Sequence, residues 1–389
     1  MNKNLPESLQ QKRIAVVADW LTSNGGAEKV TEEIANTFNA DIFTSVFLPD
    51  QFKSLTGRVK ASFLQILPPK IRKHHQFFLH LMPAAFRSLD LSEYDIIISS
   101  SASFSKAIKK SKIDQIHICY CHSPPRYLYF IEKDYVNNYP LPWFFRWCRK
   151  TVIPLFLRWL KNVDQKSIKT IDAFIANSKT TEARIEKFYK TDATVIYPNV
   201  DTKKFNAAAE QNTQRKYFLA VGRMVRYKQF PLIVEAFIKN GLPLKIGGKG
   251  PETNKCKKLI EEAQATNIEL LGFVPDEDIP QLYAGARAFI FPSHEDFGIV
   301  PVEAMAAGTP VIYYNKGGAT ESVGAGCGVA FDEQSIESLN SAVETFIDTE
   351  NTFNVGHIQA QAEKFSTENF QKNMIKYVIS IQKNNTPLI

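Results

Sequence analysis

Residues 291–312 have the sequence FPSHEDFGIVPVEAMAAGTPVI. An apolar run ends near Phe291, a polar turn follows, Gly298 opens a helical stretch, and Gly308-Thr309-Pro310 ends that helix before a second β-branched run. A strand, a helix and a strand in this order are typical of a parallel sheet with helices packed on its faces. The segment therefore predicts an α/β fold.

The same alternation continues through both halves of the chain. Residues 197–201 and 206–216 show neither helical nor strand periodicity, so a linker near residue 200 is the natural boundary. We expect two doubly wound domains, 1–200 and 201–365, with ligands bound in the cleft onto which the carboxyl ends of their strands open. The tail 366–389 contains a last helix, at about 366–382, and whether it returns to the first domain stays open. The predicted strands are 14–19, 95–99, 115–121, 172–177, 194–197, 217–221, 244–247, 268–271, 288–291, 310–313 and 328–331.

The composition is that of an ordinary folded protein. Of the 389 residues, 44% are hydrophobic and 22% are charged, which excludes collagen-like, disordered and disulfide-scaffold classes. The five cysteines are scattered without paired zinc-type spacing, which predicts buried free thiols in a reducing compartment. The opening residues MNKNLPESLQQKR have no apolar core of a signal peptide, and no run approaches the ~18 apolar residues of a membrane span. We expect a cytoplasmic protein whose membrane contact, if it has one, is peripheral.

The formal charge of +7 is concentrated in two stretches. Residues 51–90 and residues 141–170 each contain seven Lys or Arg and one acid. The cations alternate with Trp, Phe and Leu, as they do in segments that dock on an anionic membrane surface. A nucleic-acid binder would need aromatic stacking platforms beside its basic patch, which the aromatic cluster at 143–147 could imitate. We expect no nucleic-acid partner, and salt-dependent RNA binding is the check.

Residues 141–150 (LPWFFRWCRK) show this pattern most clearly. At helical spacing Trp143 and Trp147 share one face, and Pro154 is expected to break or kink any continuous helix. The segment is either a membrane-docking surface or a domain-packing helix whose rings lie in the core. The cations expected on its other face are Arg146, Arg149 and Lys150.

Three glycine-containing turns follow predicted strands. Residues 25–26 (GG) precede a helix, where backbone amides and the helix dipole favour an anion, although a plain tight turn is the alternative. In residues 222–228 (GRMVRYK), Arg223 and Lys228 can both reach a phosphate pair, unless they are solvated surface charges. Residues 247–250 (GGKG) fit close backbone approach to a ligand better than an ordinary turn.

Two carboxylates lie in the stretch at 291–312. Glu303 is about five residues into the helix, among Ala, Val and Met, and a carboxylate there needs a partner because its burial alone is costly. Vicinal sugar hydroxyls would satisfy it. The alternative is that Glu295 and Glu303 cap the helix or form local ion pairs.

Residues 276–278 (DED) contain an Asp-x-Asp pattern that elsewhere marks metal-dependent transferases. Here the acids precede an apolar helical stretch, so we expect them in a helix's first turn, capping its amides. No other acid cluster suggests an obligatory metal ion, and we expect none.

Together these motifs resemble the retaining nucleotide-sugar glycosyltransferases of family 4, whose GT-B fold contains two Rossmann-like domains. The resemblance covers nearly the whole chain. It is carried by Glu295-(seven residues)-Glu303, by residues 222–228, by GGAE at 25–28 and by GGATE at 317–321.

The resemblance implies a role for each matching residue. Arg223 and Lys228 match the pair that neutralises the donor diphosphate, Glu303 matches the acid that holds the ribose hydroxyls, and Glu295 matches the acid beside the donor sugar. His122 matches the histidine that contacts the sugar from the first domain. Gly25 and Gly26 match the loop near the acceptor and the diphosphate, and Phe297 and Gly298 match backbone contacts to the sugar hydroxyls. The other implied donor-binding positions are Gly222, Gly248, Val274 and Ile299.

Residues 121–129 (CHSPPRYLY) also look like a stretch from a subgroup of bacterial mannosyltransferases of O-antigen and exopolysaccharide assembly, which commonly use GDP-mannose. The resemblance thus implies retaining transfer of mannose from GDP-mannose to a lipid-linked or glycan acceptor, at the inner face of the cell membrane. The alternatives are a UDP-sugar-dependent enzyme, an epimerase or phosphorylase of the same fold, and a non-catalytic sugar-nucleotide binder.

Overall fold

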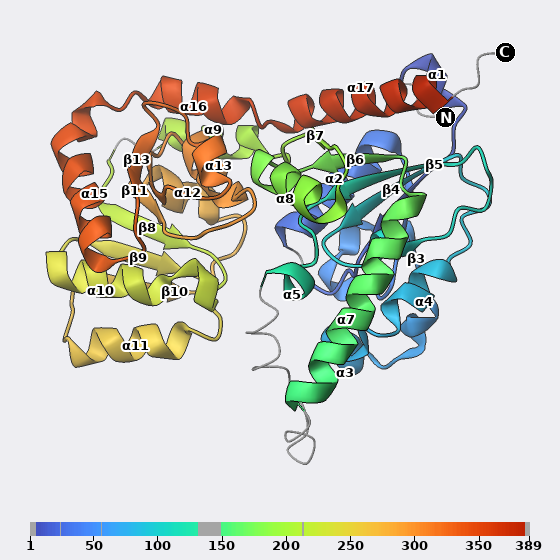
Figure 1. The fold of residues 1–389 in the computed structure, drawn as a ribbon. Coiled ribbons are helices and arrows are strands. Elements are labelled where there is room, and N and C mark those ends of the chain that lie inside the picture. Colours follow the sequence, from blue (N-terminus) through green and yellow to red (C-terminus); the bar gives the residue numbers. More distant parts are fainter. Residues whose placement is uncertain (1–4, 24, 56, 131–148, 212–213, 386–389) are drawn as a thin grey trace. The chain divides into compact units, whose positions relative to one another are not determined.

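A computed structural model describes residues 5–23, 25–55, 57–130, 149–211 and 214–385 (Figure 1). Its internal contacts divide the chain into two compact units. Unit 1 contains Met1–Tyr197 and Gln371–Ile389, and unit 2 contains Pro198–Phe370.

Unit 1 is built on a parallel sheet with the strand order β3-β2-β1-β4-β5-β6-β7. The central strands β1, β4 and β5 are buried along their whole length, as expected of parallel strands covered on both faces. In register, Val16 of β1 lies between Ile42 of β2 and Ile98 of β4. The strands are β1 (Ile14–Ala18), β2 (Asp41–Thr44), β3 (Val59–Ala61), β4 (Ile96–Ser101), β5 (Ile116–Cys121), β6 (Ala173–Ala176) and β7 (Thr194–Val195).

Helices cover both faces of this sheet (Figure 1). One core contains Ala15, Val17 and Ile97 from the strands together with apolar residues of α4 and α7. The helices of unit 1 are α1 (Glu7–Gln10), α2 (Gly26–Phe38), α3 (Pro69–Arg72), α4 (Met82–Arg87), α5 (Arg126–Tyr129), α7 (Arg149–Ser167) and α8 (Lys179–Tyr189). Its 3₁₀ turns are η1 (Pro49–Gln51), η2 (Lys53–Leu55), η3 (Phe63–Ile66), η4 (His75–Phe78), η5 (Ser105–Ala107) and η7 (Ile168–Thr170).

Unit 2 has a second parallel sheet, in the order β10-β9-β8-β11-β12-β13. Its strands are β8 (Tyr217–Val221), β9 (Leu244–Gly247), β10 (Ile268–Gly272), β11 (Ala286–Phe291), β12 (Val311–Tyr314) and β13 (Gly328–Phe331). Its helices are α9 (Thr202–Gln211), α10 (Phe230–Asn240), α11 (Thr253–Glu262), α12 (Ile279–Ala284), α13 (Ile299–Ala306), α14 (Ala319–Ser322), α15 (Ile336–Thr349) and α16 (Val355–Glu363), with 3₁₀ turns η8 (Arg226–Lys228) and η9 (Glu350–Thr352). The two parallel sheets confirm the predicted α/β fold class.

Three expectations about local structure are wrong. The short strands β2 and β3 were not predicted, because four and three residues are too short for a periodic pattern. Residues 202–211 form α9 rather than an aperiodic linker, since buried Phe205 and Ala208 pack it onto unit 2. Helix α7 is not broken at Pro154, because Ile153, Leu157 and Leu160 bury one stripe of it in the core and outweigh one missing backbone hydrogen bond; a kink there stays a prediction.

The last helix, α17 (Thr367–Asn385), belongs to unit 1 from Gln371 onward. The Gln371 amide donates to a carboxylate oxygen of Glu33 (2.7 Å), and the Tyr377 hydroxyl donates to the Phe174 carbonyl (3.2 Å). Across the described ranges, no helix has both the length and the apolar character needed to cross a membrane.

Candidate active site

The residues of unit 2 that the family resemblance singles out follow the ends of four neighbouring strands. In the sheet β10, β9, β8 and β11 are consecutive, and the carboxyl ends of parallel strands meet at one edge. The residues that follow them there are Val274, Gly248, Gly222 and Glu295.

The glycine loops after β8 and β9 pack backbone against backbone. Gly222 and Gly248 have positive φ angles of 150° and 133°, and a Cβ on Gly248 would lie 1.9 Å from the Gly222 carbonyl oxygen. A Cβ on Gly250 would lie 2.3 Å from the Met224 carbonyl oxygen. Glycine is thus required at 248 and 250 for close packing against the neighbouring loop, and the predicted approach to a ligand stays a prediction.

An ion pair joins two residues that the resemblance assigned to different parts of the donor. Lys228 Nζ lies 2.7 Å from Glu295 Oε1, and the side chains are only 13% and 16% exposed. Burial by itself lowers the pKa of Lys228, but the adjacent Glu295 carboxylate outweighs it and holds the pKa above its ordinary value. Glu295 is thus in an ion pair, as the alternative interpretation allowed, but with a distant lysine rather than a local one.

The loop that carries Glu295 rests on the glycine pair at 317–318. The Gly318 amide donates to the Glu295 carbonyl (2.9 Å), and a Cβ on Gly318 would lie 2.2 Å from Phe297 Cα. Only glycine allows the two loops to come this close. The glycine pair of the GGATE motif therefore packs against the backbone of the Glu295 loop and supports it.

Helix α13 begins beside this loop. Gly298 occupies its N-cap with φ at 82°, and Ile299 is the first helical residue. Glu303 lies one turn further on, where its Oε2 accepts a hydrogen bond from the buried Tyr283 hydroxyl (3.3 Å). The carboxylate that the sequence predicted to need a partner has one, and it remains partly exposed.

The other predicted residues of unit 2 differ in exposure. Arg223 is exposed, whereas Phe297 is buried with its ring 5.4 Å from that of Phe365. Because its ring belongs to the core, Phe297 can offer a ligand only its backbone. Val274 is half-buried and would be 3.1 Å from a Cβ on Gly247.

The acids at 276–278 do not lie in a helix's first turn. Helix α12 begins at Ile279, and Asp278 is its N-cap residue without a side-chain capping hydrogen bond. For Asp278 the predicted side-chain capping role is therefore wrong. In the part of the chain that the structure describes, no group of three or more His, Cys, Asp or Glu side chains is arranged to hold a metal ion.

In unit 1, the predicted glycine turn precedes α2. Gly26 is the first residue of α2, and the Gly25 amide donates to Glu28 Oε2 (3.1 Å). Burial raises the pKa of Glu28 to about 7. An anion at this helix start would compete with Glu28 for the Gly25 amide.

His122 directly follows β5 at the carboxyl edge of the unit 1 sheet. Its Nε2 lies 2.7 Å from Ser100 Oγ, and Ser100 Oγ lies 2.7 Å from Thr31 Oγ1. Burial lowers the pKa of His122 to about 4, so its imidazole is neutral near pH 7. Ser100 and Thr31 were missed in the sequence, although three serines ending an otherwise apolar strand are a detectable pattern.

Asp19 was also missed as a positioning group. It follows β1, and its carboxylate accepts hydrogen bonds from the backbone amides of Ala102 (2.6 Å), Ser103 (2.8 Å) and Ser105 (2.6 Å). Burial raises the pKa of Asp19 despite these donors. The residue holds the loop after β4 in place.

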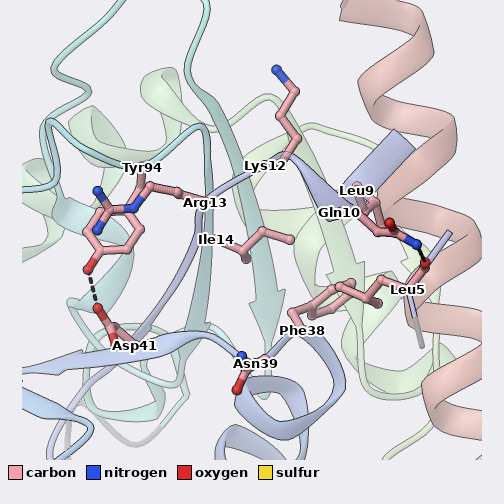
Figure 2. Close-up of a pocket in the computed structure, with 10 residues that line it drawn as sticks. All are labelled: Leu5, Leu9, Gln10, Lys12, Arg13, Ile14, Phe38, Asn39, Asp41 and Tyr94. Atoms are coloured by element: carbon pink, nitrogen blue, oxygen red, sulfur yellow. Dashed lines mark hydrogen bonds between the residues drawn. The ribbon is translucent and has the colours of Figure 1, made fainter. Parts of the chain in front are cut away.

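A separate cavity of about 180 Å³ lies at the opposite edge of the unit 1 sheet (Figure 2). It is lined by Arg13 and Ile14 at the start of β1 and by Asp41 at the start of β2. The Tyr94 hydroxyl donates to Asp41 across it (2.5 Å). Of the described residues, those that the resemblance singled out line no part of this cavity, and the amino ends of parallel strands are not the usual ligand edge.

Family models and curated relatives agree on one class of protein. The "Glycosyltransferase Family 4" model matches residues 24–204, and the "Glycosyl transferases group 1" model matches residues 201–364. O-antigen chain mannosyltransferase B of Escherichia coli is 32% identical over 164 residues, which are 39% of this chain and 43% of that protein. The α-1,3/1,6-mannosyltransferase ALG2 of Homo sapiens is 23% identical over 332 residues, 74% of each chain. The first match therefore spans less than half of its relative.

Solved structures share the whole architecture. Sucrose-phosphate synthase from Thermosynechococcus elongatus has a TM-score of 0.72 at 18% identity, covering 95% of this chain and 99% of that one. HepE from Anabaena in complex with UDP has a TM-score of 0.70 at 18% identity, covering 95% and 100%. Such identities show the fold alone, which is GT-B. With family models spanning residues 24–364, the chain belongs to glycosyltransferase family 4 and is a nucleotide-sugar-dependent glycosyltransferase.

Proposed function

We propose that this glycosyltransferase moves mannose from GDP-mannose to a lipid-linked or glycan acceptor in surface polysaccharide biosynthesis. The donor is supported by the motif at 121–129 and by the relatives' names. A GDP-mannose-dependent α-(1-6)-phosphatidylinositol monomannoside mannosyltransferase of Mycobacterium tuberculosis is 30% identical over 206 residues, 46% of this chain and 54% of that protein. The observation that carries a transferase site in unit 2 is the Lys228–Glu295 ion pair at the carboxyl edge of the sheet.

The proposed chemistry follows from the charges at this edge. The difficult step is departure of a nucleoside diphosphate from the anomeric carbon, which leaves negative charge on the phosphate. Lys228, held by its ion pair, and the exposed Arg223 are cations that would stabilise this charge without a metal ion. Glu303, oriented by Tyr283, is a suitable acceptor for two vicinal ribose hydroxyls.

In this proposal, donor binding breaks the Lys228–Glu295 ion pair, and each of the two residues exchanges its partner for a group of the donor. Lys228 pairs with the diphosphate, and Glu295 accepts a hydrogen bond from a hydroxyl of the sugar. The anomeric configuration is retained by a same-face reaction in which the leaving phosphate oxygen removes the acceptor proton. This differs from retaining glycosidases, which use two carboxylates beside the scissile bond.

A panel of GDP- and UDP-sugars tests the donor. A donor at 100 times its dissociation constant stabilises the folded state by about 2.7 kcal/mol, so GDP-mannose should raise the melting temperature most. A larger shift with a UDP-sugar would favour the second candidate, a UDP-dependent enzyme, which the UDP complex of HepE makes worth testing. Stabilisation by GDP-mannose without transfer to any lipid or glycan acceptor would indicate a non-catalytic binder.

We further propose that unit 1 docks on an anionic membrane surface where the acceptor is presented. Its exposed large apolar side chains gather in the two basic stretches, and elsewhere in the described part of unit 1 only Ile113 and Phe130 are of this kind. Those in the two stretches are Phe63, Ile66, Ile71, Phe77, Leu81, Val152, Leu155 and Trp159.

Helix α7 shows why packing alone does not explain this surface. One face buries Ile153 and Leu157 in the core, whereas Leu155 and Trp159 on another face are 63% and 47% exposed. A helix that is apolar on two faces has a second partner. Trp143, Arg146 and Trp147 lie outside the described residues, and the structure describes no side chain for Arg149 or Lys150.

Vesicle flotation tests the membrane proposal. The exposed cations Arg158 and Lys161 lie beside Trp159, and each cation near an anionic surface contributes about 1 kcal/mol. Arg158→Glu with Lys161→Glu should therefore weaken binding to anionic vesicles at least tenfold at low salt. The matched control is Lys257→Glu with Lys258→Glu, exposed on α11 of unit 2. Equal effects of the two double variants, or no binding by the wild type, would contradict the proposal.

A further inference from the structure

We propose that the hydroxyls of Thr31 and Ser100 act as positioning groups that hold His122 with its proton on Nε2, so that Nδ1 is the acceptor it offers to a sugar hydroxyl. The first half concerns the protein alone. The second half rests on the function proposed above.

The direction of the hydrogen bonds begins at Thr31 on α2. A hydroxyl has one proton, and the Thr31 hydroxyl donates it to the Ala27 carbonyl one turn earlier (2.9 Å). Its oxygen lies 2.7 Å from Ser100 Oγ and can only accept there. The Ser100 proton is therefore directed at Thr31.

The same reasoning extends to the imidazole. Because the Ser100 proton is used, Ser100 Oγ can only accept from His122 Nε2, which lies 2.7 Å away. A neutral imidazole has one N–H donor and one acceptor nitrogen. A proton on Nε2 makes Nδ1 the acceptor, and the low pKa of His122, caused by burial, keeps the ring in this neutral form.

Other contacts hold His122 in place independently of the two hydroxyls. Its backbone amide donates to the Ser101 carbonyl (2.8 Å), its carbonyl accepts from the Thr181 hydroxyl (3.3 Å), and its ring centroid lies 5.2 Å from that of Tyr120. Removing a hydroxyl should therefore change the position of the proton more than the position of the ring.

The neighbouring residues on the same two strands supply a matched control. Ser99 Oγ lies 2.9 Å from His117 Nε2, and both residues are fully buried. Because alternate residues of a strand face opposite sides of a sheet, this second Ser–His pair lies on the other face. Ser99→Ala removes the same chemical group from the same strand without touching His122.

The test is nitrogen NMR of the ¹⁵N-histidine-labelled full chain without ligand at pH 7.5, with His122 assigned by the loss of its signals in His122→Gln. The wild type should show Nε2 protonated and Nδ1 unprotonated. In Thr31→Val, Ser100 loses its acceptor and can donate to Nε2, so the tautomer ratio should shift toward Nδ1–H by about fivefold or more, the worth of one net hydrogen bond. Ser100→Ala should give a mixture of the Nε2–H and Nδ1–H tautomers of His122, and Ser99→Ala should leave the His122 signals unchanged.

Kinetics tests the second half. Ser100→Ala should raise the KM for the sugar donor while the dissociation constant of the free nucleoside diphosphate stays constant, and Ser100→Thr should restore the KM. Wild-type His122 protonated on Nδ1, or a tautomer that ignores both Thr31→Val and Ser100→Ala, would overturn the positioning role. A protein with the expected tautomer but no transferase activity would overturn the proposed function and leave the hydroxyl chain standing.

Discussion

Glu295→Gln separates the two effects of the Lys228–Glu295 ion pair. Removing one partner of a fully buried pair costs about 3–5 kcal/mol, and an exposed pair contributes about 0–1 kcal/mol. With exposures of 13% and 16% this pair lies between those limits. Since the Gln amide oxygen still accepts from Lys228, we expect a loss of about 2 kcal/mol in the free energy of unfolding.

Turnover and nucleotide binding should move in opposite directions in this variant. Loss of one charged contact to the transition state lowers kcat by about 10²–10³. In the apo protein Glu295 neutralises the cation that the diphosphate needs, so its removal should strengthen nucleoside-diphosphate binding by about fivefold, on the order of 1 kcal/mol. Calorimetric titration with GDP and UDP, beside steady-state transfer assays, measures both quantities.

Glu350→Gln is the matched control for this experiment. It makes the same chemical change in the Arg287–Glu350 ion pair (2.5 Å). Arg287 lies near the amino end of β11, opposite the strand end that Glu295 follows. Stability should fall by about 1 kcal/mol, with kcat and nucleotide affinity unchanged. Weaker nucleoside-diphosphate binding in Glu295→Gln, or turnover equal to that of the folded wild type, would refute the partner exchange.

Three further changes test other parts of the site. Arg223→Ala with Lys228→Ala should weaken nucleoside-diphosphate binding far more than nucleoside binding, because charge-assisted hydrogen bonds are about twice as strong as neutral ones. Equal losses of affinity for the two ligands in parallel titrations would show that the two residues do not bind the diphosphate. EDTA should leave sugar transfer largely intact. A strict requirement for added Mg²⁺ or Mn²⁺ would instead favour residues 276–278 as a metal-binding site. The folded-state pKa of Glu28 is raised from 4.5 to about 7, so the unfolded state loses this proton first and the free energy of unfolding should fall by about 3 kcal/mol as pH rises from about 4.5 through 7. Glu28→Gln should flatten this pH dependence in denaturant titrations, and an unchanged slope would show that another group causes it.

Sequence periodicity was sufficient for the architecture where the elements are buried on both faces. Strand β1 is a continuous apolar run and β5 is apolar apart from His117, and each is followed by a recognisable turn, so their type and order were predictable. The short strands β2 and β3 and helix α9 were missed, because three to ten residues carry little periodic information and tertiary packing stabilises them. Pro154 shows the same principle, since burial of the α7 stripe outweighs the local helix-breaking preference.

For the site, the sequence by itself determined which chemical groups follow which strands: two cations after β8, two carboxylates after β11 and a histidine after β5. Their family also followed from these motifs. Only the tertiary structure decided their partners. It pairs Lys228 with Glu295 and closes the Gly222 loop on Gly248. It also sets the Thr31 and Ser100 hydroxyls in line with His122. The physical reason is sheet order: parallel strands far apart in the chain become neighbours, and hydrogen bonds and ion pairs depend on distances that no sequence spacing specifies.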